Sequence, residues 1–306
     1  MNELNEFDPV QSRNSAIRMA EHFESTGQLG RAKDQLLEAL ATDPENTEIH
    51  CKLGYVLLLL EKPHEARRHA RTVLAADGEN IQALALMGGI HSELGENREA
   101  EKFYLSALRL APHDPVLLRL YGRLMFRVDE HQKAHDLFLA SLELDPNDEI
   151  TTGLLSLVQM ELGKGSDARH LSEKNISNAP EEAFAHLTMA ATHYQSGRIW
   201  TAKRHAREAL RLDPNEEASA KLYIEIDRSS RLIGLPYYYW SLLLEKIPGG
   251  PFAVWIGFVV MIKVLPQSPA VTWIAGAYIL FVIYTWLAQP LMKLWTKIRP
   301  SPVGRL

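Results

Sequence analysis

The stretch LDPND, Leu144–Asp148, recurs along the chain in near-copies that share one spacing. The related stretches are TDPEN from Thr42, ADGEN from Ala76, LAPHD from Leu110, NAPEE from Asn178 and LDPNE from Leu212. Their Pro or Gly stands at positions 44, 78, 112, 146, 180 and 214, so every step is 34 residues. Proline has no N–H to donate and its ring clashes with the preceding turn, so each copy is expected to end a helix.

Two further columns keep the same period. One is always alanine, at Ala32, Ala66, Ala100, Ala134, Ala168 and Ala202, and the other is small, at Ala20, Gly54, Gly88, Gly122, Ser156 and Ala190. Two helices approach closely only where no large side chain stands between them. Between the columns lies a polar or Gly-containing turn such as STGQLGR, which ends the first helix of each pair. The pattern predicts helix-turn-helix repeats.

The 34-residue period, the small columns and the closing proline resemble the tetratricopeptide repeat (TPR) family. The resemblance implies an all-α, right-handed superhelical solenoid of six repeats, after an N-terminal extension over 1–12. The repeats are placed at 13–46, 47–80, 81–114, 115–148, 149–182 and 183–216. A capping helix is expected over 217–234. The fifth repeat carries Ser156, Ser172 and Asn175 at normally small or apolar positions, which predicts looser packing.

Charge and aromatic content divide the chain into two regions. The net charge is −5, but six basic residues and one acidic residue follow Leu235, so the first 234 residues carry about −10. Five of the six tryptophans also lie in this last part. An acidic region without a basic run does not fit nucleic-acid binding. A lone cysteine and an N-terminus without a signal-peptide pattern favour a cytoplasmic first domain.

The C-terminal region predicts a transmembrane helical hairpin over 251–289. The stretch 269–289 has 21 residues without a charge, enough to cross a bilayer core of about 30 Å. The run 251–265 is a second span in this interpretation, with a re-entrant or surface helix as the alternative. The basic residues flank the hairpin, which predicts cytoplasmic termini and a basic tail over 290–306. The segment 235–250 is interpreted as an interfacial segment or linker, with four aromatic residues at headgroup level: Tyr237, Tyr238, Tyr239 and Trp240.

Catalytic chemistry has no recognisable residues here, so the sequence predicts neither an enzyme nor a cofactor or metal. His131 and His135, like His186 and His193, share a helix face without a third ligand, and both pairs are interpreted as surface histidines. Cys51 lies in an apolar helical context and is expected to be buried.

A stripe of three arginines is the strongest candidate for a binding site. Arg119, Arg123 and Arg127 recur every four residues on the first helix of the fourth repeat. In the resembled family the first helices line the concave face, and by register this face also takes Tyr55, Glu93 and Tyr194. Arginine binds carboxylates through its bidentate fork, so a partner's acidic segment or C-terminal carboxylate is the candidate ligand. A solvated face is the alternative interpretation.

The sequence thus predicts a membrane-anchored adaptor or scaffold that binds a protein or peptide partner on its concave face and contacts membrane lipid. The alternative is an accessory subunit of a membrane complex, channel or transporter, in which the hairpin assembles with other spans and the repeats are a sensor or assembly platform. An oligomer is a further candidate assembly. A bacterial inner membrane is the first expectation for its location, with the repeats in the cytoplasm.

Overall fold

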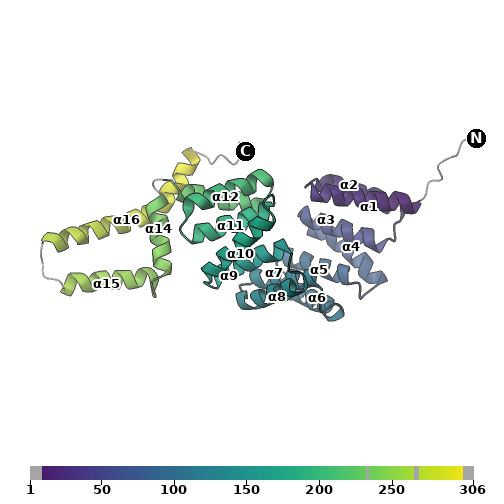
Figure 1. Cartoon of the computed structure of the whole chain (residues 1–306), viewed down its shortest axis with the longest axis horizontal. Helices are drawn as coiled ribbons and strands as arrows, with labels where there is room; N and C mark the ends of the chain where they lie inside the picture. The colour runs from purple at the N-terminus through teal and green to yellow at the C-terminus, as the bar shows by residue number, and fades with distance from the viewer. Residues whose placement is uncertain (1–8, 232–233, 265–268, 299–306) are drawn as a thin grey trace, which may run out of the picture. The chain divides into compact units, whose positions relative to one another are not determined.

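The computed structural model describes residues 9–231, 234–264 and 269–298, which form sixteen helices and no strand (Figure 1). The first eight residues of the expected N-terminal extension, the turn at 265–268 and the tail from 299 lie outside the described residues. The chain divides into two compact units, 1–151 and 152–306, which are considered separately below.

The helices come in pairs at the predicted period. In the first unit they are α1 (Pro9–Ser25), α2 (Leu29–Thr42), α3 (Thr47–Leu59), α4 (Pro63–Ala76), α5 (Ile81–Glu93), α6 (Asn97–Leu110), α7 (Pro115–Arg127) and α8 (His131–Leu144). Helix α9 (Glu149–Glu161) begins in that unit, and α10 (Gly165–Asn178), α11 (Ala183–Gln195) and α12 (Ile199–Leu212) follow in the second. Helix α1 starts at Pro9, within the stretch that the sequence assigned to an extension.

The recurring turn caps the next helix with a polar side chain. Asn46 and Asn80 accept hydrogen bonds from the backbone N–H groups of Ile49 and Ala83, each at 3.0 Å. Asp114 and Asp148 do the same at the starts of α7 and α9. Each cap satisfies donors that a helix N-terminus leaves unpaired. The sequence LDPND therefore both ends one helix and begins the next.

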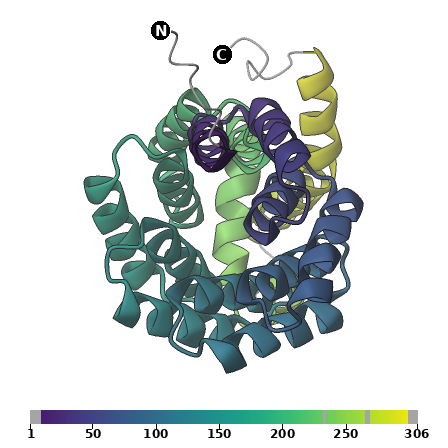
Figure 2. The same ribbon diagram turned by 90° about the vertical axis from the view of Figure 1, so that its right-hand side faces the viewer.

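The two small columns form the contact inside each pair, as the sequence predicted. All six alanines of the alanine column have no exposed surface. A Cβ added at Gly88 would lie 2.7 Å from the ring of Tyr104, and one at Gly122 would lie 2.6 Å from the ring of Phe138. A small residue on the first helix thus makes room for a large one on the second. Pairs then stack in chain order, from α1–α2 through α7–α8 (Figure 2).

Hydroxyl groups replace apolar contacts in the fifth repeat. Ser156 and Ser172 are fully buried and their hydroxyl oxygens lie 2.9 Å apart, while Ser172 also bonds Thr192 of the next repeat at 3.0 Å. Asn175 is 1% exposed, and neither atom of its amide finds a partner among the described residues. The polar residues are therefore enclosed, and three of the hydroxyls pair with one another.

Histidine pairs occupy equivalent positions in the second and sixth repeats. The Nδ1 atoms of His50 and His69 lie 2.9 Å apart, and those of His186 and His205 lie 3.1 Å apart. The Nε2 of the first histidine in each pair lies 3.0 Å from Pro44 O and 3.1 Å from Pro180 O, respectively. A carbonyl can only accept, so this Nε2 carries the proton and the Nδ1 of that ring accepts from its partner.

The interpretation of His135 and His193 as surface residues is wrong. Both are buried, at 9% and 5% exposure. His193 stacks on His205 with ring centroids 5.7 Å apart. The spacing within α11 does not reveal the cover of His193, because the stacked ring of His205 comes from α12.

Two helices close the repeat array in the second unit. Helix α13 (Glu217–Ser229) buries Tyr223 and Ile226 against α12, and Asp227 pairs with Lys203 and Arg231, each at 2.7 Å. Helix α14 (Gly234–Glu245) continues the packing. Its Tyr238 is 4% exposed, stacks on Tyr194 and donates its hydroxyl hydrogen to the Tyr194 carbonyl. The prediction that Tyr238 lies at a membrane surface is therefore wrong.

The other three aromatic residues of that cluster lie nearer the surface of α14. The backbone N–H of Tyr237 donates to the Tyr284 hydroxyl at 3.1 Å, and Trp240 meets Phe281 edge-on at 4.9 Å. Tyr239 is half exposed. The predicted interfacial segment is thus a helix that joins the repeats to the C-terminal helices.

Helices α15 (Gly250–Val264) and α16 (Pro269–Ile298) follow, with Phe258 stacked on Tyr278 at 3.8 Å. Within the described part of the chain, no individual helix combines the length and the apolar composition that a bilayer span requires. Helices α14 and α15 meet both requirements only as a pair, which is bent by 92°. The predicted hairpin of two separate spans is therefore not supported, and Trp273–Ala288 is a shorter apolar segment.

Candidate partner-binding groove

A groove of about 820 Å³ crosses the first helices of the first unit. It is lined by side chains of α1, α3, α5 and α7, with Tyr104 of α6 behind them. Its walls are mainly apolar, from Leu58, Leu59, Leu86 and Leu120. Tyr55, Leu59 and Val116 keep 48%, 42% and 46% of their surface exposed. An exposed apolar row beside open space is typical of a binding surface.

Carboxylates line the α1–α3 side of the groove. Glu21 pairs with Lys52 at 2.5 Å, while Glu24 and Glu48 have no ion-pair partner in the described ranges. Loss of solvation raises the pKa of Glu24, and the neighbouring Glu21 carboxylate adds to the effect against the opposing influence of Lys52. A cation placed here would therefore gain two unanswered acceptors.

The repeat register aligns the groove with the arginine stripe. Steps of 34 residues connect Glu21, Tyr55, Gly89 and Arg123, one residue in each of the first four repeats. The first three line the groove. From the first repeat to the fourth, the residue at this position is an acidic one, an aromatic one, a glycine and then a basic one. A comparison of the residues at this register position in successive repeats would have identified the acidic side of the groove. The spacing of the arginines within one helix does not show it.

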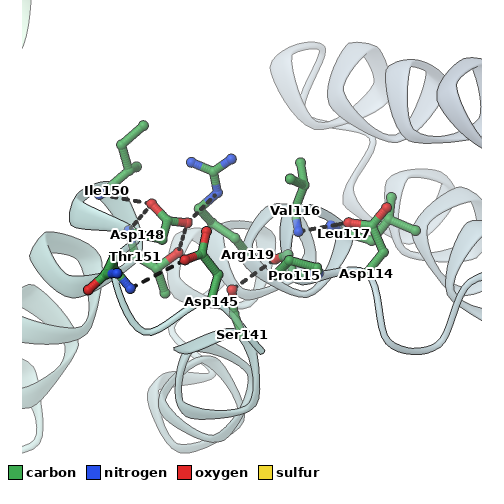
Figure 3. Close-up of polar contacts among 11 residues, drawn as sticks. Asp114, Pro115, Val116, Leu117, Arg119, Ser141, Asp145, Asp148, Ile150 and Thr151 are labelled. Atoms are coloured by element: carbon green, nitrogen blue, oxygen red, sulfur yellow. Dashed lines mark hydrogen bonds and ion pairs between the residues drawn. The ribbon is translucent and has the colours of Figure 1, made fainter. Parts of the chain in front are cut away.

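Two of the three arginines already have anionic partners. The Nε of Arg119 lies 3.4 Å from Asp148, the residue that caps α9 (Figure 3). Arg127 donates to Glu93 at 2.6 Å and to the carbonyl of Ser92 at 2.7 Å. The contacts of Arg127 link the third and fourth repeats, whereas Asp148 lies in the closing turn of the repeat that contains Arg119. The repulsion of stacked like charges is thereby offset at both ends of the stripe.

Arg123 differs from its neighbours. It is exposed, and it forms no ion pair with any residue in the described ranges. The charge of Arg123 also affects the pKa of Tyr55. Loss of solvation raises that pKa most, and the Glu24 carboxylate raises it further, while the charges of Arg123 and Arg119 lower it. Tyr55 therefore lies within electrostatic reach of both the acidic and the basic side of the groove.

The six predicted site residues are divided between the two units and have different surroundings. Tyr55 lies in the groove, and Arg119 and Arg123 lie near it. Arg127 and Glu93 form an ion pair with each other. Tyr194 belongs to the second unit, where its hydroxyl lies 2.8 Å from Ser229 and its ring stacks on Tyr238. Desolvation raises the Tyr194 pKa to about 12.

Reactive groups are not assembled in the groove. Burial raises the pKa of the Cys51 thiol to about 11, so it stays protonated at neutral pH. Three or more His, Cys, Asp or Glu residues never come together in metal-binding geometry in the part of the chain that the structure describes.

Comparison with family models matches the first part of the repeat array. Two family models, both described as tetratricopeptide repeat, match residues 17–81 and 57–124. No sequence among curated proteins matches the chain.

Three solved structures share the fold at low sequence identity. A chain of the APC/C hetero-tetramer Cut9–Hcn1 gives a TM-score of 0.59 at 17% identity over 70% of this chain, which spans only 42% of that chain's length. PilF of Pseudomonas aeruginosa gives 0.50 at 21% identity, covering 71% of this chain and 99% of its own. A thermophilic TPR protein of Thermus thermophilus gives 0.56 at 17%, covering 59% and 98%. These similarities establish the fold alone.

Proposed function

We propose that this chain, whose repeats are tetratricopeptide repeats, is a scaffold that binds a segment of a protein partner in the groove of its first unit and holds it at a membrane. The main observation that supports this proposal is the row of exposed apolar residues along the groove: Tyr55, Leu59 and Val116. Burying such residues under a partner removes apolar surface from water. Helix-pair repeats characteristically offer extended binding surfaces of this kind.

Changing the groove surface should abolish partner capture. We expect Tyr55→Lys combined with Val116→Lys to reduce recovery of co-purified partners at least about tenfold, because a lysine must be desolvated where an apolar contact was lost. The measurement is affinity purification of the full chain in mild detergent, with quantitative mass spectrometry.

A matched control lies on the second helices of the same unit. Leu105 and Leu139 are 48% and 41% exposed and lie outside the groove. Leu105→Lys with Leu139→Lys should leave capture unchanged. Loss of capture in this control, with retention in the groove variant, would assign binding to the second helices and overturn the proposal.

Membrane attachment is proposed for α15 and α16. Their support is an exposed apolar surface, with Val264, Trp273 and Trp286 at 75%, 80% and 78% exposure. The stretch 269–289 contains no charged residue. Surface of this kind requires a lipid or protein cover. Basic residues before α15, such as Lys246, and in the last turns of α16, Lys293 and Lys297, favour an orientation with the repeats on the cytoplasmic side. The membrane in this proposal is a bacterial inner membrane.

Alkaline extraction of membranes distinguishes insertion of α15 and α16 into the bilayer from loose association of the chain with the membrane surface. We expect the full chain to stay in the membrane fraction after alkaline carbonate washing, because apolar insertion is insensitive to charge and pH. A chain ending at Glu245 should move to the supernatant. Release of the full chain by carbonate would contradict the proposal. Unchanged exposure of Trp273 to a water-borne quencher when lipid vesicles are added would also contradict it.

A further inference from the structure

The groove of the first unit has carboxylates on its α1–α3 side, and an arginine lies beside it on α7. Glu24 and Glu48 lie on α1 and α3, and neither forms an ion pair in the described part of the chain. Arg123 lies on α7, at the register position that Glu21 and Tyr55 occupy in the first and second repeats. The apolar wall between them comes from Leu58 and Leu86. Along the first helices, acidic side chains on α1 and α3 are thus followed by an apolar wall and then by Arg123 on α7, which lies beside the groove and within electrostatic reach of Tyr55.

The neighbouring charges sharpen this polarity. Lys52 is the one basic residue in the groove wall, and Glu21 neutralises it at 2.5 Å. On the other side, Arg119 is engaged by Asp148 and Arg127 by Glu93. Among the described residues at or beside the groove, the charged groups without an ion pair are thus two carboxylates on the α1–α3 side and the Arg123 guanidinium on α7. Charge complementarity at an interface fixes the direction and register of a bound partner.

We infer that the groove binds a linear protein segment in one orientation, with a Lys or Arg of the segment beside Glu24 and Glu48, an apolar residue over Leu58 and Leu86, and a carboxylate at Arg123. This inference rests on the proposed function and adds the chemistry and direction of the bound segment. Arg123 can take the carboxylate with two parallel hydrogen bonds, which sets its position as well as its charge. A segment with the reverse charge order would place like charges together at both sides.

Selection from a library of short random peptides tests this chemistry without a known partner. The full chain in mild detergent is the bait, and the enriched peptides are sequenced. We expect peptides in which a basic residue precedes or follows an acidic one in a single preferred order, with an apolar residue between them. An enriched peptide should lose at least about tenfold in affinity when its two charged residues are exchanged.

Two charge-reversed variants locate each end of the segment. Arg123→Glu should weaken that peptide at least about tenfold, and exchange of its acidic residue for lysine should restore binding. Glu24→Lys with Glu48→Lys should remove the preference for a basic residue. Arg98→Glu, at an exposed arginine of α6 outside the groove, should change neither.

The failures are distinguishable. Enriched peptides that compete for the groove but carry no ordered charge pair would overturn this inference and leave the groove as a binding surface. Enrichment that Tyr55→Lys with Val116→Lys does not affect would overturn the proposed function together with the inference. If Arg98→Glu and Arg123→Glu weakened peptide binding equally, the effect would come from the overall charge of the chain. That result would overturn the inference but not the proposed function.

Discussion

Gly122→Val should lower the free energy of unfolding by about 3 kcal/mol, because it places carbon atoms where a buried ring already lies. A Cβ at this position would lie 2.6 Å from Cε1 and 2.8 Å from Cδ1 of Phe138. Phe138 has no exposed surface, so its ring has no solvent to move into. The repeat pair α7–α8 would have to separate, and the stacking on its neighbours would weaken with it.

A matched control separates this clash from a change in helix propensity. Gly30 lies in α2, and nothing comes within 4 Å of a Cβ built there. Gly30→Val should change the stability by less than about 0.5 kcal/mol. Urea unfolding followed by circular dichroism measures both variants. Equal effects at the two glycines would contradict the close contact between α7 and α8.

Phe138 itself supplies a second check. Phe138→Ala alone should cost about 3–5 kcal/mol through the cavity it leaves. The double variant with Gly122→Val should cost clearly less than the two single variants combined, because valine then occupies part of that cavity. Additive costs would mean that the two positions do not touch.

Acidification should destabilise the second unit through His205. Burial lowers the pKa of His205 from 6.5 to about 4, and the rings of His186 and His193 and the charge of Arg204 act in the same direction, opposed by Glu208. The folded state therefore binds this proton more weakly than the unfolded state does. Its contribution to stability is complete above pH 6.5 and is lost as the pH falls toward 4.

The expected loss between about pH 7.5 and pH 5 is about 2 kcal/mol from this group. His205→Gln should remove that part of the pH dependence, since glutamine does not titrate. Exposed His64 of α4 is the control, and His64→Gln should keep the wild-type pH dependence. Chemical unfolding at both pH values gives the comparison. A His205→Gln variant with the full wild-type loss would contradict the role of this histidine.

The sequence predicted the repeats because their determinants are local and periodic. A proline or glycine every 34 residues and an alanine column with no exposed surface are visible without any knowledge of distant contacts. The pairing of small and large residues, such as Gly122 with Phe138, needs only the register as well.

The candidate site was predicted in part for the opposite reason. The anionic partners of Arg119 and Arg127 are Asp148, in the turn that closes the same repeat, and Glu93 of the preceding repeat, and a stripe within one helix does not reveal them. Tyr238 was predicted at a membrane surface, but it is buried and stacked on Tyr194, which lies more than one repeat away in the chain. Side chains whose surroundings come from another helix are those that local patterns assign least well.

Site-specific photo-crosslinking in cells tests the central claim most directly. A photoreactive phenylalanine derivative would replace Tyr55 in the groove or Leu105 on α6, two positions with the same 48% exposure. The proposed scaffold predicts a discrete protein adduct at position 55 that Arg123→Glu diminishes, and none of that adduct at position 105. The same adduct at both positions, or an adduct at position 105 alone, would contradict binding in the groove.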